Sequence, residues 1–169
     1  MNDSAEVKLK SALEFRIGEI LRERKLTLAL AESCTGGLVS DRITNVPGSS
    51  EYFLGGVVAY SNEVKVSLLN VSSDMLTMHG AVSREAVLEM ARGVRKNLKS
   101  DIGVSISGIA GPGGGTESKP VGTVWLALAA PDGEWTRLNQ FTGNREEIKA
   151  ASADAALRLI LDYLVGGLD

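Results

Sequence analysis

Apolar residues recur at helical spacing in three segments of the chain. The three apolar faces consist of Leu13, Ile17, Ile20 and Leu21; of Val87, Met90, Val94 and Leu98; and of Ala153, Leu157, Ile160, Leu161 and Leu164. Spacings of three and four residues place such side chains on one side of a helix. The pattern therefore predicts three amphipathic helices that pack against a core.

Five short runs rich in apolar and branched residues lie between these helices and predict strands. The runs cover residues 26–31, 56–60, 102–107, 121–128 and, more weakly, 135–141. Pro131-Asp132-Gly133 separates the last two runs, which is typical of a hairpin turn. Because helices and strands alternate along the chain, we expect a single α/β domain over residues 1–169. Its architecture would be a three-layer α/β/α arrangement with a mixed, mostly parallel sheet.

The composition is that of an ordinary globular protein. Of the 169 residues, 44% are hydrophobic and 23% are charged, and the formal net charge is −3. Lys and Arg residues are scattered rather than clustered, so we expect no nucleic-acid partner. No apolar run approaches the roughly 20 residues of a membrane span, and residues 1–10 are polar rather than signal-like. We therefore expect no membrane partner and a cytoplasmic location.

The chain holds one cysteine, Cys34, and one histidine, His79. An internal disulfide and a Cys/His zinc site are therefore not expected. We expect an activity without metal or cofactor, with carboxylate-held magnesium as the alternative. His79 precedes a helix that Ser83 is expected to cap, and we expect it to have a loop role. Small α/β enzymes are often symmetric assemblies, so a homo-oligomer is expected.

The run at 26–31 leads into a turn of small reactive residues, Glu32-Ser33-Cys34-Thr35-Gly36-Gly37. A strand-to-helix turn presents free backbone N–H groups and the positive end of a helix dipole, where an anion or a developing oxyanion can be held. Ser33 and Thr35 are therefore candidates for chemistry. The alternative is that one of their hydroxyls only caps the following helix.

A second loop, Gly108-Ile109-Ala110-Gly111-Pro112-Gly113-Gly114-Gly115, follows the predicted strand 102–107. Glycines let the backbone approach a ligand closely and present N–H groups to phosphate. The loop lacks the Gly-Lys-Ser/Thr ending of a nucleoside triphosphate loop, so the alternative is a flexible connection. Because both loops leave strand ends, where ligands sit in open α/β sheets, we expect them to face one cleft.

Lys65 occupies an unusual position for a lysine. Tyr60 is expected to end a strand, and Ser61-Asn62 to cap a helix that carries Lys65 in its first turn. A helix N-terminus disfavours a cation. Lys65 is therefore solvated, paired with an acid such as Glu32 or Glu63, or lowered in pKa for use as a base. A neutral lysine beside a serine hydroxyl can accept its proton, as histidine does in the more familiar triad.

Six motifs follow one another along most of the chain. They are Ala31-Glu32-Ser33-Cys34-Thr35-Gly36-Gly37, Pro47-Gly48-Ser49-Ser50, Tyr60-Ser61-Asn62-Glu63 with Lys65, His79-Gly80-Ala81-Val82-Ser83, Ser107-Gly108-Ile109-Ala110-Gly111-Pro112 and Lys119-Pro120-Val121-Gly122-Thr123-Val124. Together they resemble the C-terminal domain family of the competence-damage protein CinA, from about residue 13 to 164. Stand-alone members of this family resemble nicotinamide mononucleotide deamidases. The resemblance implies hydrolysis of the carboxamide of nicotinamide mononucleotide to nicotinic acid mononucleotide and ammonia, in pyridine nucleotide recycling.

The resemblance also implies an active site. The positions that match the family's proposed site are Ser33, Ser50, Tyr60, Lys65 and Ser107, where the family often has threonine. A serine would attack the carboxamide carbon, Lys65 oriented by Tyr60 would shuttle the proton, and N–H groups of residues 34–36 would hold the oxyanion. Ser33 is the first choice as nucleophile and Ser50 the second.

The remaining expected contacts are with the nucleotide. The glycine loop and Ser107 would hold the ribose phosphate, and Arg145 would add a cationic contact at the start of the last helix. The residues expected to bind substrate are Glu32, Thr35, Gly36, Ser107, Gly108, Gly111, Gly113 and Arg145. Two other functions compete with this hypothesis: a nucleotide-binding regulatory module without catalysis, and an amidase for a different pyridine or pterin-like amide.

Overall fold

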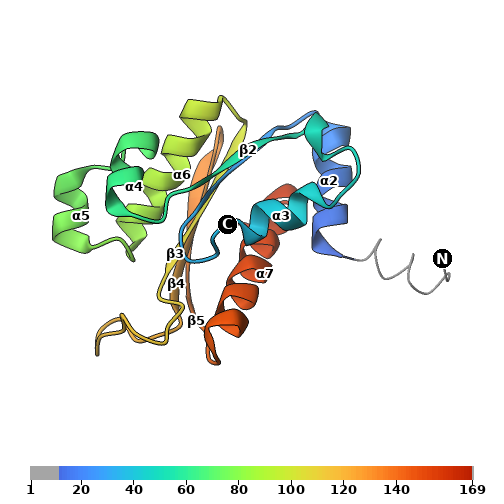
Figure 1. Cartoon of the computed structure of the whole chain (residues 1–169). Coiled ribbons are helices and arrows are strands. Elements are labelled where there is room, and N and C mark those ends of the chain that lie inside the picture. Colours follow the sequence, from blue (N-terminus) through green and yellow to red (C-terminus); the bar gives the residue numbers. More distant parts are fainter. Residues whose placement is uncertain (1–11, 169) are drawn as a thin grey trace.

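The computed structural model describes residues 12–168, so the polar segment 1–10 and Asp169 of the expected domain lie outside the described residues. The elements follow one another in the order that the sequence predicts (Figure 1). The helices are α2 (Leu13–Arg24), α3 (Leu38–Thr44), α4 (Asn62–Leu69), α5 (Ser73–His79), α6 (Arg84–Leu98) and α7 (Arg145–Leu164), with a 3-10 turn η1 (Ser49–Glu51). The strands are β1 (Leu28–Glu32), β2 (Phe53–Val58), β3 (Ile102–Gly108), β4 (Thr123–Ala130) and β5 (Gly133–Gln140).

The strands form one sheet in the order β2-β1-β3-β4-β5. β1 pairs in parallel with β2 and with β3, whereas β4 pairs antiparallel with both β3 and β5. β4 therefore runs against the other strands, and the expected mixed, mostly parallel sheet is confirmed. β4 and β5 form the hairpin expected around Pro131-Asp132-Gly133.

Helices cover both faces of the sheet, so the three-layer arrangement is confirmed. Figure 1 shows α2, α3 and α7 on one face and α4, α5 and α6 on the other. Alternate residues of β1 serve the two layers. Leu28 and Leu30 pack in the core that includes residues of α2 and α7, while Ala29 and Ala31 pack in the core that includes residues of α6. A strand buried on both faces is uniformly apolar, which explains the unbroken run in the sequence.

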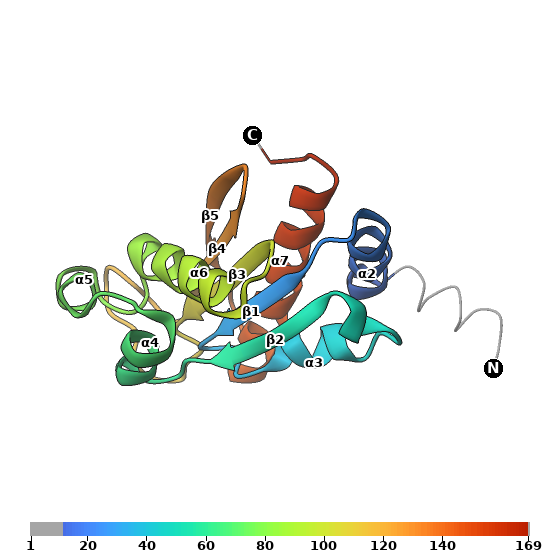
Figure 2. The same cartoon turned by 90° about the horizontal axis from the view of Figure 1, so that it is seen from above.

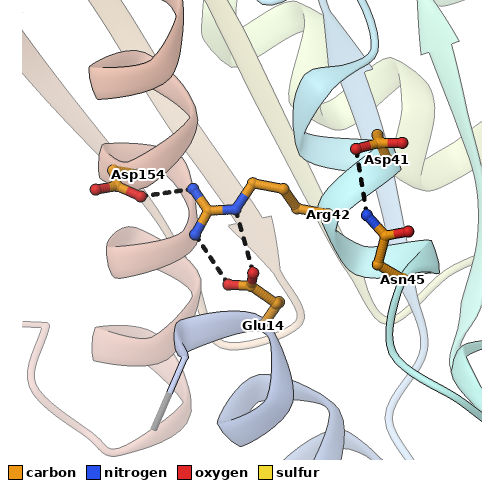
Figure 3. Close-up of polar contacts among 5 residues, drawn as sticks. All are labelled: Glu14, Asp41, Arg42, Asn45 and Asp154. Atoms are coloured by element: carbon orange, nitrogen blue, oxygen red, sulfur yellow. Dashed lines mark hydrogen bonds and ion pairs between the residues drawn. The ribbon is translucent and has the colours of Figure 1, made fainter. Parts of the chain in front are cut away.

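An ion-pair cluster joins the three helices of one face (Figure 3). The Arg42 guanidinium of α3 donates to the Glu14 carboxylate of α2 at 2.9 Å and also bonds Asp154 of α7. Beside it, the Asn45 amide donates to the Asp41 carboxylate at 3.3 Å. A network that shares one guanidinium holds its members in place better than separate surface pairs. The cluster therefore fixes α3, and with it the turn that follows β1, relative to α2 and α7.

The predicted bounds of β2 were wrong. The strand begins at Phe53, which pairs with Leu28, and ends at Val58, instead of covering residues 56–60. Gly55 and Gly56 weaken the strand pattern of this segment and concealed its start. Tyr60 consequently lies in the loop between β2 and α4, beyond the end of the strand.

The carboxyl ends of the parallel strands meet at one edge of the sheet. In Figure 2 the arrowheads of β1 and β2 point to the side on which α4 lies. The loops that leave β1, β2 and β3 therefore converge there, as expected for ligand sites in such sheets.

Candidate active site

A cavity of about 230 Å³ lies where these loops converge. Its lining consists of Ser33, Cys34, Tyr60, Asn62, Lys65, Ala81, Val82, Ser107, Gly108, Ala110 and Arg145. These residues come from the segments after β1 and β2, from the end of β3 and the loop after it, from α4, from the loop before α6 and from the start of α7. The two loops that the sequence analysis singled out thus contribute to the same cavity.

Ser33 is held firmly at the end of β1. Its backbone N–H donates to the Ile106 carbonyl of β3 at 2.9 Å, and its carbonyl accepts the Gly36 N–H at 3.1 Å. The side chain is nearly buried, with 9% of its surface exposed. Its Oγ lies 3.2 Å from Lys65 Nζ. The structure therefore pairs the first-choice nucleophile with the candidate base.

Lys65 extends from α4, whose N-cap Ser61 accepts a hydrogen bond from Val64 N–H as expected. The lysine is 1% exposed, and its Nζ donates to the Ala59 carbonyl at 2.8 Å and, in a longer contact, to that of Tyr60 at 3.5 Å. It forms no ion pair within residues 12–168. Burial lowers the pKa of Lys65 below the usual lysine value, against smaller opposing effects of Cys34 and Glu63. Of the three alternatives, burial excludes the solvated lysine and no ion pair is formed within the described residues, which leaves the lysine with a lowered pKa.

Glu32 serves the turn rather than the cavity wall. Its carboxylate accepts hydrogen bonds from the N–H groups of Gly37, Val39 and Ser40 and from the Ser40 hydroxyl, at 2.7–3.1 Å. A carboxylate with four donors at the start of α3 acts as a helix cap. Glu32 is not among the residues that line the cavity, and its carboxylate holds the turn that carries Ser33.

Thr35 and Gly36 also belong to this turn and are not in the lining. Gly36 has a φ of +65°, and its N–H is used by the Ser33 carbonyl. It is therefore not free to hold an oxyanion. The Thr35 hydroxyl is buried and has no hydrogen-bond partner within the described residues. The N–H groups of Cys34 and Thr35 donate to no backbone carbonyl within residues 12–168, and of these two residues only Cys34 lines the cavity.

Arg145 and Tyr60 meet at the rim of the cavity. Arg145 is the first residue of α7, as expected, and its guanidinium donates to the Tyr60 hydroxyl at 2.8 Å and to the Gly111 carbonyl at 2.7 Å. Tyr60 is 60% exposed. Its phenol therefore contacts Arg145, whereas its backbone carbonyl contacts Lys65. Tyr60 orients the lysine through the main chain and not through its hydroxyl.

The glycine loop contributes unevenly. Ser107 and Gly108 line the cavity, and the Ser107 hydroxyl donates to the Ala81 carbonyl at 2.8 Å. Gly108 packs so closely on β4 that an added Cβ would lie 2.6 Å from a Val124 methyl. Gly111 binds Arg145, whereas Gly113 is exposed and has open space around its Cβ position. The base of the loop is thus part of the cavity and its tip is not.

Ser50 is the expected catalytic residue that its own chain does not bring to the cavity. It lies exposed in η1, before β2, where the Tyr52 carbonyl accepts the Leu28 N–H at the start of β1. Ser33 follows the other end of β1, about 16 Å away along an extended strand. Ser50 and Tyr60 are only ten residues apart in the sequence. Because β2 lies between them, Ser50 is near the amino end of this strand and Tyr60 near its carboxyl end.

The side chains of Cys34, Asn62, Ala81 and Val82 also line the cavity, and the sequence analysis assigned none of these side chains to the site. Burial raises the pKa of the Cys34 thiol to about 12, so the neutral thiol is the form present near neutral pH. Asn62, expected only as a helix cap, faces the same cavity from the first residue of α4. Val82 lines it from the loop before α6, where the motif His79-Gly80-Ala81-Val82-Ser83 was the available signal.

Two further searches of the described residues, 12–168, gave no candidates. No helix there is long and apolar enough to span a bilayer. No three His, Cys, Asp or Glu side chains there gather as ligands of one metal ion would.

Comparison with known proteins places this chain in a family. The CinA C-terminal domain family matches residues 10–164. The chain is 52% identical over 154 residues to a CinA-like protein of Thermotoga maritima, covering 91% of this chain and 38% of that protein. The crystal structure of the competence/damage inducible protein CihA from Agrobacterium tumefaciens superposes with a TM-score of 0.87 at 39% identity, over 90% of this chain and 93% of that one. A CinA superfamily protein from Klebsiella pneumoniae gives 0.88 at 34% identity, over 91% and 96%. The chain spans little more than a third of the length of the curated relatives that it matches, 36% to 38%.

Proposed function

This chain belongs to the CinA C-terminal domain family, and from that premise we propose that it hydrolyses the carboxamide of nicotinamide mononucleotide to nicotinic acid mononucleotide and ammonia. The observation that carries the proposal is the buried amine of Lys65, 3.2 Å from the Ser33 hydroxyl in a cavity. Amide hydrolysis requires a nucleophile, a base that later acts as an acid, and donors for the oxyanion. The cavity offers a candidate for each.

The surroundings of Lys65 suit a neutral amine. Such an amine has two N–H groups and one lone pair, and Nζ has two carbonyl oxygens and one hydroxyl as neighbours. The N–H groups can face Ala59 and Tyr60, which leaves the lone pair for the Ser33 hydroxyl hydrogen. Burial favours this form, because it disfavours the charged one.

Acylation would begin as Ser33 Oγ attacks the carboxamide carbon and its proton passes to Lys65 Nζ. The carbonyl oxygen becomes an oxyanion, which the N–H group of Cys34 would stabilise. The C–N bond then breaks, and the Lys65 ammonium protonates the departing nitrogen. Ammonia leaves, the lysine is neutral again, and Ser33 carries a nicotinoyl ester of the nucleotide.

Deacylation would use the same groups, with Lys65 now passing a proton from water to Ser33 Oγ. Lys65 removes a proton from water, whose oxygen attacks the ester carbon. The second tetrahedral intermediate expels Ser33 Oγ, which takes the proton from Lys65. Nicotinic acid mononucleotide is released, and one water has been consumed for each ammonia formed.

Ammonia release tests this proposal. Purified protein would be incubated without added metal with nicotinamide mononucleotide, nicotinamide riboside and nicotinamide, and ammonia would be measured. We expect release from the mononucleotide and much less from the other two. Tight mononucleotide binding in calorimetry without any release would overturn catalysis and support a regulatory module instead.

A further inference from the structure

A second cleft, of about 370 Å³, borders the cavity. Its lining consists of His79, Val82, Ser83, Arg84, Glu85, Lys119 and Trp125. Val82 lines both spaces. The two spaces therefore meet at the loop of residues 79–83, which the Ser107 hydroxyl anchors through the Ala81 carbonyl.

The sheet register sets the span between the two spaces. Ser33 follows Glu32, the partner of Ile106, so it lies beside Ser107 of β3. Ser107 is in turn the partner of Trp125 in β4. Two strand spacings of 4.7–4.9 Å put Trp125 about 10 Å from Ser33. A pyridine ring and a ribose separate a carboxamide from a 5′-phosphate by a comparable distance.

The cavity around Ser33 is small for a site that binds a whole mononucleotide. Its volume of about 230 Å³ falls below the roughly 300–1,000 Å³ usual for sites of drug-sized ligands. A pyridine carboxamide can occupy it, and we expect the rest of the nucleotide to extend beyond it. The second cleft is the adjoining space whose lining also carries positive charge.

Lys119 and Arg84 supply that charge. The Lys119 ammonium donates to the His79 carbonyl at 2.8 Å, which leaves two of its three N–H groups for a ligand. Arg84 uses its Nε for the Thr136 hydroxyl at 3.3 Å, and its terminal nitrogens make no hydrogen bond within residues 12–168. Arg84 opens α6, so the positive end of a 15-residue helix also borders the cleft.

The other charged groups of the cleft and the rim weaken this charge only in part. The Glu85 carboxylate opposes an anion, and it lies 3.8 Å from His79 Nδ1, a cation when protonated. At the opposite rim Arg145 already donates to Gly111 and Tyr60. Arg145 keeps three of its five N–H groups but lies at the rim of the Ser33 cavity, so Lys119 and Arg84 are the cations of the second cleft with donors to spare.

We propose that this second cleft binds the 5′-phosphate monoester of the nucleotide whose carboxamide lies at Ser33, through Lys119 and Arg84. The inference rests on the proposed function for the identity of the ligand. It replaces the expectation that the glycine loop holds the phosphate. The same Lys119 ammonium would therefore bind the phosphate and, through the His79 carbonyl, hold the loop of residues 79–83 in place.

Paired binding measurements test the proposal. Calorimetry would give the dissociation constants of nicotinamide mononucleotide and of nicotinamide riboside for wild type, Lys119→Met, Lys119→Arg, Arg84→Gln and Lys96→Gln. Lys96 is an exposed cation near the other end of α6 and controls for net charge. We expect Lys119→Met and Arg84→Gln to weaken mononucleotide binding about tenfold or more, as loss of a charged hydrogen bond does. Riboside binding should stay unchanged, Lys119→Arg should restore affinity, and Lys96→Gln should match wild type.

Other results would overturn the phosphate site. Equal loss of both ligands would show that the substitutions damage the cavity wall, and unchanged mononucleotide binding would show that the phosphate lies elsewhere. A protein that binds neither ligand would refute the site as well. Failure of the proposed function gives a different result. If the wild type releases no ammonia, but the variants still lose mononucleotide binding and not riboside binding, the phosphate site stands and the proposed reaction does not.

Discussion

Lys65 Nζ lies 3.2 Å from Ser33 Oγ, although 32 residues separate the two in the chain. The pair joins the turn after β1 to the helix after β2, two segments that parallel pairing of these strands brings to one edge of the sheet. Both side chains are shielded from solvent. A buried lysine is costly unless its charge is neutralised or removed, so its retention beside a hydroxyl points to chemistry.

The rate of hydrolysis should depend on the protonation of Lys65. In the proposed mechanism the neutral amine is the active form, so kcat/KM should rise with pH and fall as the amine is protonated at low pH. Because burial lowers the pKa of Lys65, the midpoint should lie below the usual lysine value of about 10.4. A pH series of initial rates gives the midpoint. A midpoint at or above that value would contradict the role of a buried base.

The two candidate serines should behave differently. Ser33→Ala should lower kcat by about 10³-fold or more, whereas Ser50→Ala should stay within a few-fold of wild type, because Ser50 lies at the opposite edge of the sheet. Steady-state kinetics of both variants checks this. An equal loss of kcat in Ser50→Ala would contradict the assignment of Ser33 alone as the catalytic serine. If mixing the Ser50→Ala and Ser33→Ala proteins then restored activity, a second chain would bring Ser50 to the site.

Tyr60→Phe should separate the two functions of this residue. The substitution removes the hydroxyl that accepts from Arg145 but keeps the backbone carbonyl near Lys65. We expect KM to rise by about tenfold, while the pH midpoint of kcat/KM stays where it is. A shifted midpoint would mean that the phenol acts on the lysine directly.

Glu32→Gln should destabilise the fold. The carboxylate accepts four hydrogen bonds at the start of α3 while almost fully buried, and the amide would turn a donor towards some of these donors. We expect a loss of about 1–3 kcal/mol in the free energy of unfolding, measured by urea denaturation. Glu19→Gln, an exposed change in α2, is the matched control. Equal midpoints for the two variants would remove the capping role.

Much of the fold follows from local patterns in the sequence. The helical faces of α2, α6 and α7 and the hairpin around Pro131-Asp132-Gly133 depend on neighbouring residues, so periodicity and turn chemistry suffice to predict them. The start of β2 depends instead on its partner. Phe53 belongs to a strand because it pairs with Leu28, and no local signal outweighs the two glycines that follow.

The sequence predicted several residues of the candidate site, but only partly how these residues are arranged. Ser33 and Lys65 were assigned together because their residue types fit one mechanism, and parallel pairing then brings them into contact. Ser50 belongs to a neighbouring motif that points to the same function. It precedes β2, however, whereas the cavity lies beyond the carboxyl end of that strand. The contacts of Glu32 could not be predicted. A sequence does not reveal that three backbone N–H groups at the start of α3 converge on one carboxylate.

In the proposed hydrolysis of nicotinamide mononucleotide, Lys65 carries out the proton transfer. The most direct measurement compares ammonia release and mononucleotide binding for wild type, Lys65→Met and Lys96→Met. Lys65→Met should lose turnover by about 10³-fold or more and bind the mononucleotide within roughly tenfold of wild type, while Lys96→Met matches wild type in both. Near-normal ammonia release by Lys65→Met would contradict the account.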